Sequence, residues 1–205
     1  MASVSSSIIE DIDGMQKLGL ASMAFFYCDF REEQKKDSRG LLSSWLDQLC
    51  HQSDAYSDIL SKFYLKHNNG SRQPSEDALI ECLKEILKLS EQAPVYLIVD
   101  ALDECPVTSS LSSPRDKVLM VMENLIDSQF PNTRVCITSR PETDIKAVLG
   151  PLTFRSTSLH DESGQMEDIN YYIRSIVNTD RRMRRWKATD KQLVIDVLTN
   201  KADGM

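Results

Sequence analysis

Ten residues at 95–104, VYLIVDALDE, constrain the fold of this chain more than any other stretch. The apolar run from Val95 to Val99 has the length and composition of a buried β-strand. Carboxylates follow it at once, on Asp100, Asp103 and Glu104. In an open α/β domain, the carboxyl end of such a strand is where ligands bind. The run therefore predicts an α/β fold with an acidic site at a strand end.

The rest of the chain alternates short apolar strands with amphipathic helices, the order expected of an α/β domain with a mostly parallel sheet. Besides the strand at 95–100, we expect strands at 22–28, 134–140 and about 152–159. Helices are expected from Asp37 or Ser38 through Leu49, and over 55–65, 74–87, 117–128, 165–177 and 189–199.

The composition is that of a globular chain with one medium-sized core, because 41% of the 205 residues are hydrophobic and 27% are charged. No apolar run approaches the roughly 18 to 20 residues that span a bilayer. The N-terminal residues, MASVSSS, lack the charged and apolar regions of a signal peptide. We therefore expect an intracellular, cytoplasmic protein with no membrane partner.

Net charge bears on the partner. The value of −7 argues against a nucleic-acid partner, since phosphate backbones bind positive surfaces. One basic cluster stands out, RRMRRWK at 181–187. We expect it to form a solvated surface between two helices. The alternative is a contact with nucleic acid or acidic lipid, in which Trp186 could stack on a base.

Cysteine and histidine show no metal-binding pattern. The five cysteines, Cys28, Cys50, Cys82, Cys105 and Cys136, are widely spaced and include no C-x-x-C pair, so we expect buried free thiols. His51, His67 and His160 lack metal-ligand spacing, and we expect them in loops or at the surface.

The acids after Val99 fit magnesium chemistry, since magnesium takes oxygen ligands and one strand-end carboxylate can hold it through its waters. Asp100 suits that role, and Asp103 or Glu104 could orient an attacking water, with the choice between them left open by spacing. The strand at 134–140 ends in Thr138, Ser139 and Arg140, so a cation should face the same crevice. The alternative is structural: Asp100 caps the strand, and the other acids open a solvated loop.

These motifs support a resemblance. VYLIVDALDEC, followed about thirty residues later by RVCITSRPE, resembles the Walker B and sensor regions of NACHT-type (STAND) signalling NTPases, particularly fungal NLR-like proteins and the nephrocystin-3-like N-terminal domain. SSSIIEDI, AFFYCDF, SRGLLSSWLDQL and the terminal KADGM also look like their counterparts in that family. The resemblance covers nearly the whole chain.

The resemblance implies a P-loop NTPase-like, three-layer α/β/α fold that binds magnesium with ATP or GTP and switches a signalling oligomer in fungal defence or self/non-self recognition. It implies that Asp100 holds magnesium through water, that Asp103 and Glu104 are the catalytic acids, and that Ser139 and Arg140 contact the nucleotide. It also implies a core at 1–160 and the start of a helical region at 161–205. Expected partners are related NACHT chains, or flanking effector and repeat domains.

The chain departs from this family pattern in one respect, because it contains no G-x-x-x-x-G-K-[ST] loop. Only Met1 to Val4 precede SSSIIEDI, so the phosphate loop and the strand before it are missing from the expected fold. Tight nucleotide binding and independent hydrolysis are then not expected. We expect an excerpt of a longer protein, a truncated paralogue or an unfamiliar phosphate site, in that order. The alternative function is a non-catalytic interaction module or decoy that pairs with full-length relatives.

Overall fold

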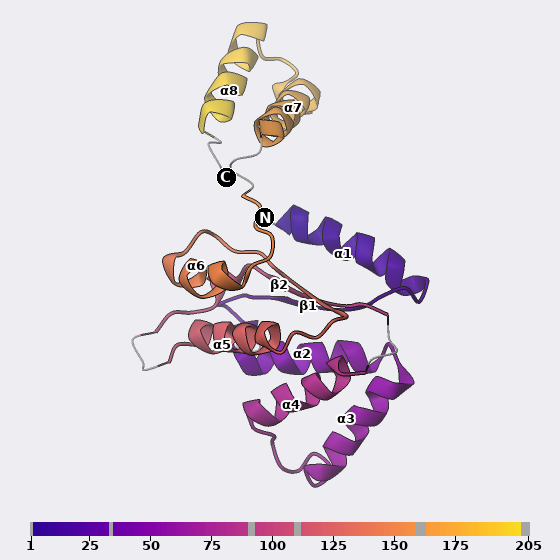
Figure 1. Ribbon diagram of the computed structural model, residues 1–205. Coiled ribbons are helices and arrows are strands. Elements are labelled where there is room, and N and C mark those ends of the chain that lie inside the picture. Colours follow the sequence, from indigo (N-terminus) through magenta and orange to yellow (C-terminus); the bar gives the residue numbers. More distant parts are fainter. Residues whose placement is uncertain (1, 33–34, 90–92, 109–111, 159–162, 202–205) are drawn as a thin grey trace. The chain divides into compact units, whose positions relative to one another are not determined.

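The computed structural model describes residues 2–32, 35–89, 93–108, 112–158 and 163–201 (Figure 1). These residues form eight α-helices and one three-stranded sheet. The chain divides into two compact units, Met1–Thr153 and Phe154–Met205. The sheet belongs to the first unit. No helix in the described ranges is long and apolar enough to cross a membrane.

The sheet is entirely parallel and its strands follow the chain order, β1 (Ser22–Tyr27), β2 (Val95–Asp100) and β3 (Thr133–Ile137). In register, Ser22 lies opposite Val95, and Val95 lies opposite Thr133. The predicted parallel α/β fold is confirmed. Because the strands are parallel, all their carboxyl ends meet at one edge of the sheet.

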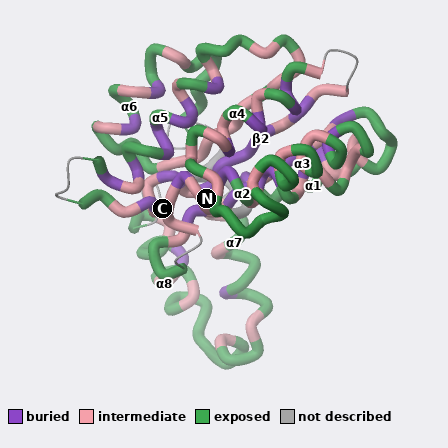
Figure 2. Tube along the Cα trace, turned by 90° about the horizontal axis from the view of Figure 1, so that it is seen from below, coloured by how far each residue is buried: buried purple, intermediate pink, exposed green. Residues whose placement is uncertain are grey.

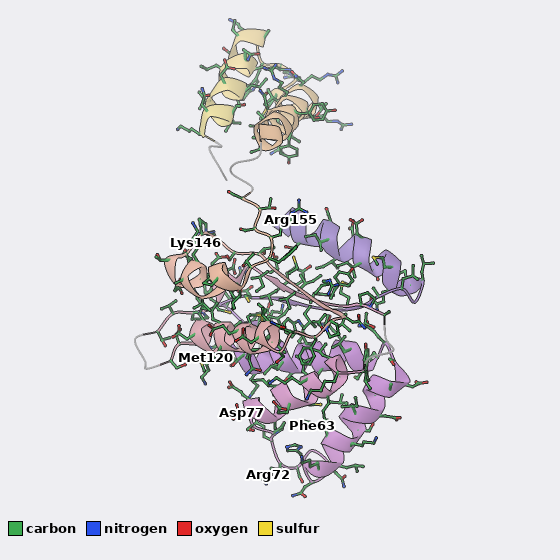
Figure 3. All side chains as sticks on the ribbon, in the orientation of Figure 1. Phe63, Arg72, Asp77, Met120, Lys146 and Arg155 are labelled. Atoms are coloured by element: carbon green, nitrogen blue, oxygen red, sulfur yellow. The ribbon has the colours of Figure 1, made fainter. Side chains whose placement is uncertain are left out.

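Helices cover both faces of the sheet (Figure 1). One face packs against α1 (Ala2–Lys17), through Ile12, Met23 and Ile98. The other contributes Ala24, Phe26, Leu97 and Val99 to a larger core with α2 (Ser38–Cys50), α4 (Glu76–Leu87), α5 (Pro114–Asp127) and α6 (Thr143–Leu149). Figure 2 shows buried residues along β2, and Figure 3 shows side chains filling the space between helices and sheet. The alternation along each strand thus produces the expected three layers.

Local sequence sets the helix ends. The Asp37 carboxylate accepts the backbone N–H of Gly40 (2.8 Å) and caps α2. Ser113 and Asp116 form a reciprocal capping box on α5, with Pro114 as its first residue. The predicted helices in this unit are confirmed within a few residues, and α3 spans Asp54–Lys66. Helix α6 was not predicted, because seven residues are too few for a helical period to stand out.

The predicted strand at 152–159 is wrong over its described part. Residues 150–152 form a 3₁₀ turn, and residues 153–158 pair with no strand in the described structure. Phe154 is fully exposed. Leu152 and Phe154 are apolar residues two positions apart, which is the pattern of a strand. A strand also needs a hydrogen-bonded neighbour and a buried face, and this segment has neither in the described structure. Residue 159 lies outside the described residues. Strand β3 also ends at Ile137, three residues before the expected end at Arg140.

The second unit is a helical hairpin of α7 (Ser163–Thr179) and α8 (Ala188–Lys201), in which Val177 and Ile195 are buried. A 3₁₀ turn at Arg181–Met183 connects the helices, and Asp180 caps it by accepting the N–H of Arg182 (2.8 Å). Residues 181–187 are exposed apart from the half-buried Met183, so the expected solvated connection is confirmed. The assignment of 161–205 to a following helical region stays a prediction.

The outer edge of β1 is bonded by two glutamine side chains, Gln48 of α2 and Gln52 just beyond the end of that helix. Gln48 accepts the N–H of Phe25 (3.0 Å) and donates to its carbonyl (2.7 Å). Gln52 accepts the N–H of Met23 (2.9 Å) and donates to its carbonyl (2.6 Å). Each side-chain amide therefore satisfies the backbone N–H and C=O of one residue, as a neighbouring strand would. Gln52 continues the path of α2 by one turn, with its side chain bonded to the Gln48 carbonyl (2.8 Å), so the two amides meet alternate residues of the strand.

The outer edge of β3 differs. Thr138 N–H donates to Val99 of β2 (2.9 Å), so in the alternating pattern of a strand the N–H and C=O groups of Val135 and Ile137 face away from β2. In the described part of the chain, no side chain covers these groups as the glutamines cover β1. Val135, Cys136 and Ile137 are half-buried, although they are apolar. This edge is open to a further strand.

Replacing both Gln48 and Gln52 by alanine should destabilise the protein and increase its self-association. Four hydrogen bonds to the β1 edge are lost, which should lower the free energy of unfolding by about 2 kcal/mol or more, and the bare edge becomes a template for pairing. Urea denaturation and size-exclusion chromatography measure the two effects. The control is Gln73→Ala at an exposed position. Equal stability of the double variant and the control would contradict the assignment.

Candidate functional site

The candidate site lies at the carboxyl edge of the sheet and centres on Asp100, which ends β2 and is 6% exposed. Two hydroxyl groups donate to the same carboxylate oxygen, Oδ1. One belongs to Ser5 of α1, which is fully buried, and the other to Thr138, immediately after β3. Asp100 thus joins a helix and two strands that are far apart in the sequence.

Thr138 and the backbone around it fix the turn that follows Asp100. The Thr138 hydroxyl accepts the N–H of Ala101 (3.1 Å), and its carbonyl accepts the N–H of Leu102 (3.0 Å). Ala101 has φ 54 and ψ 48, a left-handed conformation that costs an L-residue roughly 1–2 kcal/mol. The turn buries Leu102 and leads into a short 3₁₀ helix, Leu102–Glu104. The two acids after Asp100 are therefore held in a defined loop.

Asp103 and Arg140 form an ion pair in this loop. The Asp103 carboxylate accepts the backbone N–H of Arg140 (2.9 Å) and lies 3.4 Å from the guanidinium Nε. The Asp103 side chain is 8% exposed, whereas that of Arg140 is 70% exposed. Glu104 is half-buried at the end of the loop. The hydrogen bond that Arg31 donates to Asp29 raises the pKa of Arg31, and the negative charge of Glu104 adds to this shift. Arg31 in turn holds the pKa of Asp29 well below its usual range, at about 2, by hydrogen bonding to its carboxylate.

A buried arginine, Arg115, donates hydrogen bonds to backbone carbonyls of the acidic loop. Arg115 of α5 donates to the carbonyl groups of Asp103 (2.5 Å) and Cys105 (3.0 Å) and pairs with Asp144 of α6 (3.1 Å). It is only 9% exposed. A guanidinium can satisfy several acceptors at once, so Arg115 ties the loop to two helices. Its role is to position the acids.

Two buried thiols lie at the same edge, just after β1 and after the acidic loop. Cys28 and Cys105 are both free cysteines, and their side chains are hydrogen-bonded. This bond and burial raise the pKa of Cys28, while the same bond lowers the pKa of Cys105. Burial also raises the pKa of Cys82 to about 12. The expected buried thiols are confirmed at these three positions, whereas Cys50 and Cys136 are half-buried.

The structure brings most of the predicted site residues together. Asp100, Asp103, Glu104 and Arg140 occupy the carboxyl edge of the sheet, and Arg140 meets Asp103. The half-buried Ser139 lies beside them, but the hydroxyl that reaches Asp100 is that of Thr138. Their assigned roles stay predictions.

Sequence reasoning missed two residues of the site, Ser5 and Arg115, and it placed Thr138 at this edge without giving it a role. The register of the two strands explains why Thr138 reaches Asp100. Val99 lies opposite Ile137, so the residues that follow them, Asp100 and Thr138, lie side by side. Ser5 is 95 residues from Asp100, and no local pattern marks the contact. Arg115 lies before the helix expected at 117–128, in a polar segment where a charge is not unusual.

A comparison with known protein families identifies the family to which the residues of this edge belong. Residues 3–140 match the family described as Nephrocystin 3, N-terminal, from α1 through Arg140. This chain belongs to that family. The nephrocystin-3 N-terminal domain is related to NTPases, so the resemblance of the two motifs is confirmed at this level. No curated protein and no solved structure matches the chain.

The residues at this edge fit a magnesium ion better than they fit nucleotide phosphates. Asp100, Ser5 and Thr138 supply oxygen atoms, which magnesium prefers. Phosphates need backbone N–H groups and a lysine, which a Gly-rich loop supplies, and the 205 residues contain no such loop. Arg140, the cation beside the acids, is paired with Asp103.

Replacing Thr138 by valine should destabilise the first unit. Valine has the same shape but no hydroxyl, so the buried Asp100 carboxylate loses a donor and the Ala101 N–H loses its acceptor. We expect a loss of about 1–3 kcal/mol in the free energy of unfolding. Thr138→Ser, which keeps the hydroxyl, is the matched control in urea denaturation. The two variants unfolding at the same urea concentration would rule out this role.

Proposed function

We propose that this chain is a signalling NTPase-like domain of the NACHT type in which the ancestral magnesium–nucleotide switch is impaired. The observation that carries the proposal is the Asp100 cluster: an acid at the end of the middle strand, joined to hydroxyls from a helix and from the next strand. A ligand that contacts Asp100 would therefore alter hydrogen bonds to α1 and to the end of β3 at the same time.

Magnesium, when bound with ATP or GTP, would neutralise phosphate charge, and Asp100 with Ser5 would hold it. The Asp100 carboxylate already receives two hydroxyl donors, so its charge is stabilised without a ligand. Asp103 is largely buried and already paired with Arg140, so its carboxylate is poorly placed to meet a water molecule. Glu104, half-buried at the loop end, is the better candidate for orienting water.

The purified 205-residue chain should show no magnesium-dependent nucleotide hydrolysis above that of Asp100→Asn and Glu104→Gln. We also expect a fluorescent ATP analogue to bind the wild type and these variants alike, because the lysine and N–H cradle that give affinity are absent from these residues. Circular dichroism confirms that each protein is folded. Hydrolysis that Glu104→Gln abolishes without unfolding would contradict the proposed impairment.

A second function is favoured by the two unlike edges of the sheet. We propose that the domain also associates with related chains, including copies of itself, by adding a strand to β3. Backbone groups of Val135 and Ile137 would bond to the incoming strand, and the half-buried apolar side chains beside them would be covered. The glutamine cap on β1 supports this choice, because it excludes the other edge from pairing.

Amide hydrogen exchange tests strand addition residue by residue. As the protein concentration rises, exchange at Val135 and Ile137 should slow, while exchange at Met23 and Phe25, already bonded to glutamines, should stay unchanged. Analytical ultracentrifugation over the same range reports the assembly size. Association that leaves Val135 and Ile137 unprotected would place the interface elsewhere and exclude this mode.

A further inference from the structure

Three potential metal ligands converge at the C-terminal end of α2, away from the Asp100 cluster. Asp47, Cys50 and His51 each offer one ligand atom, and these atoms all lie within 4.8 Å of one another. Cys50 Sγ is 3.5 Å from His51 Nδ1, which is 4.0 Å from Asp47 Oδ1. The cluster uses an acid, a thiol and an imidazole at positions i, i+3 and i+4, which share one face of a helix.

The distances suit a small transition-metal ion. Zinc binds sulfur at about 2.3 Å and nitrogen at about 2.0–2.1 Å, so a tetrahedral site separates these two ligands by about 3.5 Å. The separation of Cys50 and His51 already has this value. Asp47 Oδ1 lies 4.0 Å from the imidazole nitrogen and must move closer to both other ligands, which its 75% exposed side chain can do by rotating.

The end of the helix adds to the attraction for a cation. Helix C-termini carry a partial negative charge from carbonyl groups without backbone partners. The Asp47 carbonyl accepts both the Cys50 thiol (3.0 Å) and the His51 Nδ1–H (2.6 Å). These two contacts gather the thiol and the imidazole at the helix end, and both give way when an ion binds, because each uses the proton that its ligand atom must release.

We propose that Asp47, Cys50 and His51 form a divalent-metal site for zinc, with water completing the coordination. Binding requires the Cys50 thiol to release its proton to solvent and the His51 Nδ1 proton to leave or shift to Nε2, so that sulfur and nitrogen each offer a lone pair. Because ion binding releases protons from these ligands, affinity should increase with pH.

The chain contains a built-in comparison at the end of α3. His67 caps that helix as His51 caps α2, and its Nδ1 also contacts the carbonyl four residues earlier, that of Phe63 (2.8 Å). The residues at the positions of Asp47 and Cys50 are there Phe63 and Lys66. His67 thus has the same backbone setting without the other two ligands, and it should not bind the ion.

Cobalt(II) substitution tests the site, because a cobalt–thiolate bond gives a near-ultraviolet charge-transfer band. The reduced, chelator-treated 205-residue protein is titrated with cobalt and then with zinc. We expect one equivalent of cobalt to produce the band and zinc to remove it. Cys50→Ser should abolish the band, and His51→Gln and Asp47→Asn should weaken binding about tenfold or more.

Cys136→Ser and His67→Gln are the matched controls and should bind like the wild type. Circular dichroism shows whether each variant is folded, and the exposed positions of Asp47 and His51 favour this. A wild-type protein that gives no cobalt–thiolate band, or a band that survives Cys50→Ser or is lost in Cys136→Ser, would overturn the proposal.

Discussion

Burial of the Asp100 carboxylate is the constraint on which the first unit depends. A charged group removed from water is costly unless other groups replace its hydration. Ser5 and Thr138 do so, and each comes from a different element. The pair of hydrogen bonds therefore orders α1 against β2 and sets the end of β3 beside the end of β2. An acid that suits a ligand site is also the residue that holds the layers in register.

The sheet has one closed and one open edge, and both arise from side-chain chemistry. Glutamine is long enough to reach across from α2, and its amide offers a donor and an acceptor in the plane of the ladder. Gln48 and Gln52 use this to satisfy β1, which would otherwise present free N–H and C=O groups. On β3, the outward groups of Val135 and Ile137 have no such cover in the described part of the chain. One edge of the sheet thus has its backbone groups bonded by side chains, and the other offers them to a further strand.

The sequence predicted the elements better than their contacts. Strand β2, the Asp37 cap and the acidic edge were foreseeable, because apolar runs, capping residues and strand-end acids are local signals. The contacts of Ser5 with Asp100, of Gln48 with Phe25 and of Arg115 with Asp103 depend on chain segments that meet only after folding. The strand expected at 152–159 failed for the same reason: Leu152 and Phe154 alternate correctly, but pairing is decided by a neighbour that local pattern does not report.

Helix α2 and the two residues that follow it combine three roles, and this links the two proposals about the domain. Leu41, Leu42, Trp45 and Leu49 face the core and Gln48 and Gln52 reach the β1 edge, while Asp47, Cys50 and His51 end the helix in contact with solvent. Residues 47 to 52 are the last turn of α2 and the two residues after it, so an ion that fixes Asp47, Cys50 and His51 also fixes the backbone that carries both glutamines. Fraying at this end would release the cap on β1 and create a second free edge. Ligation here would oppose that release, and strand addition would then be confined to β3.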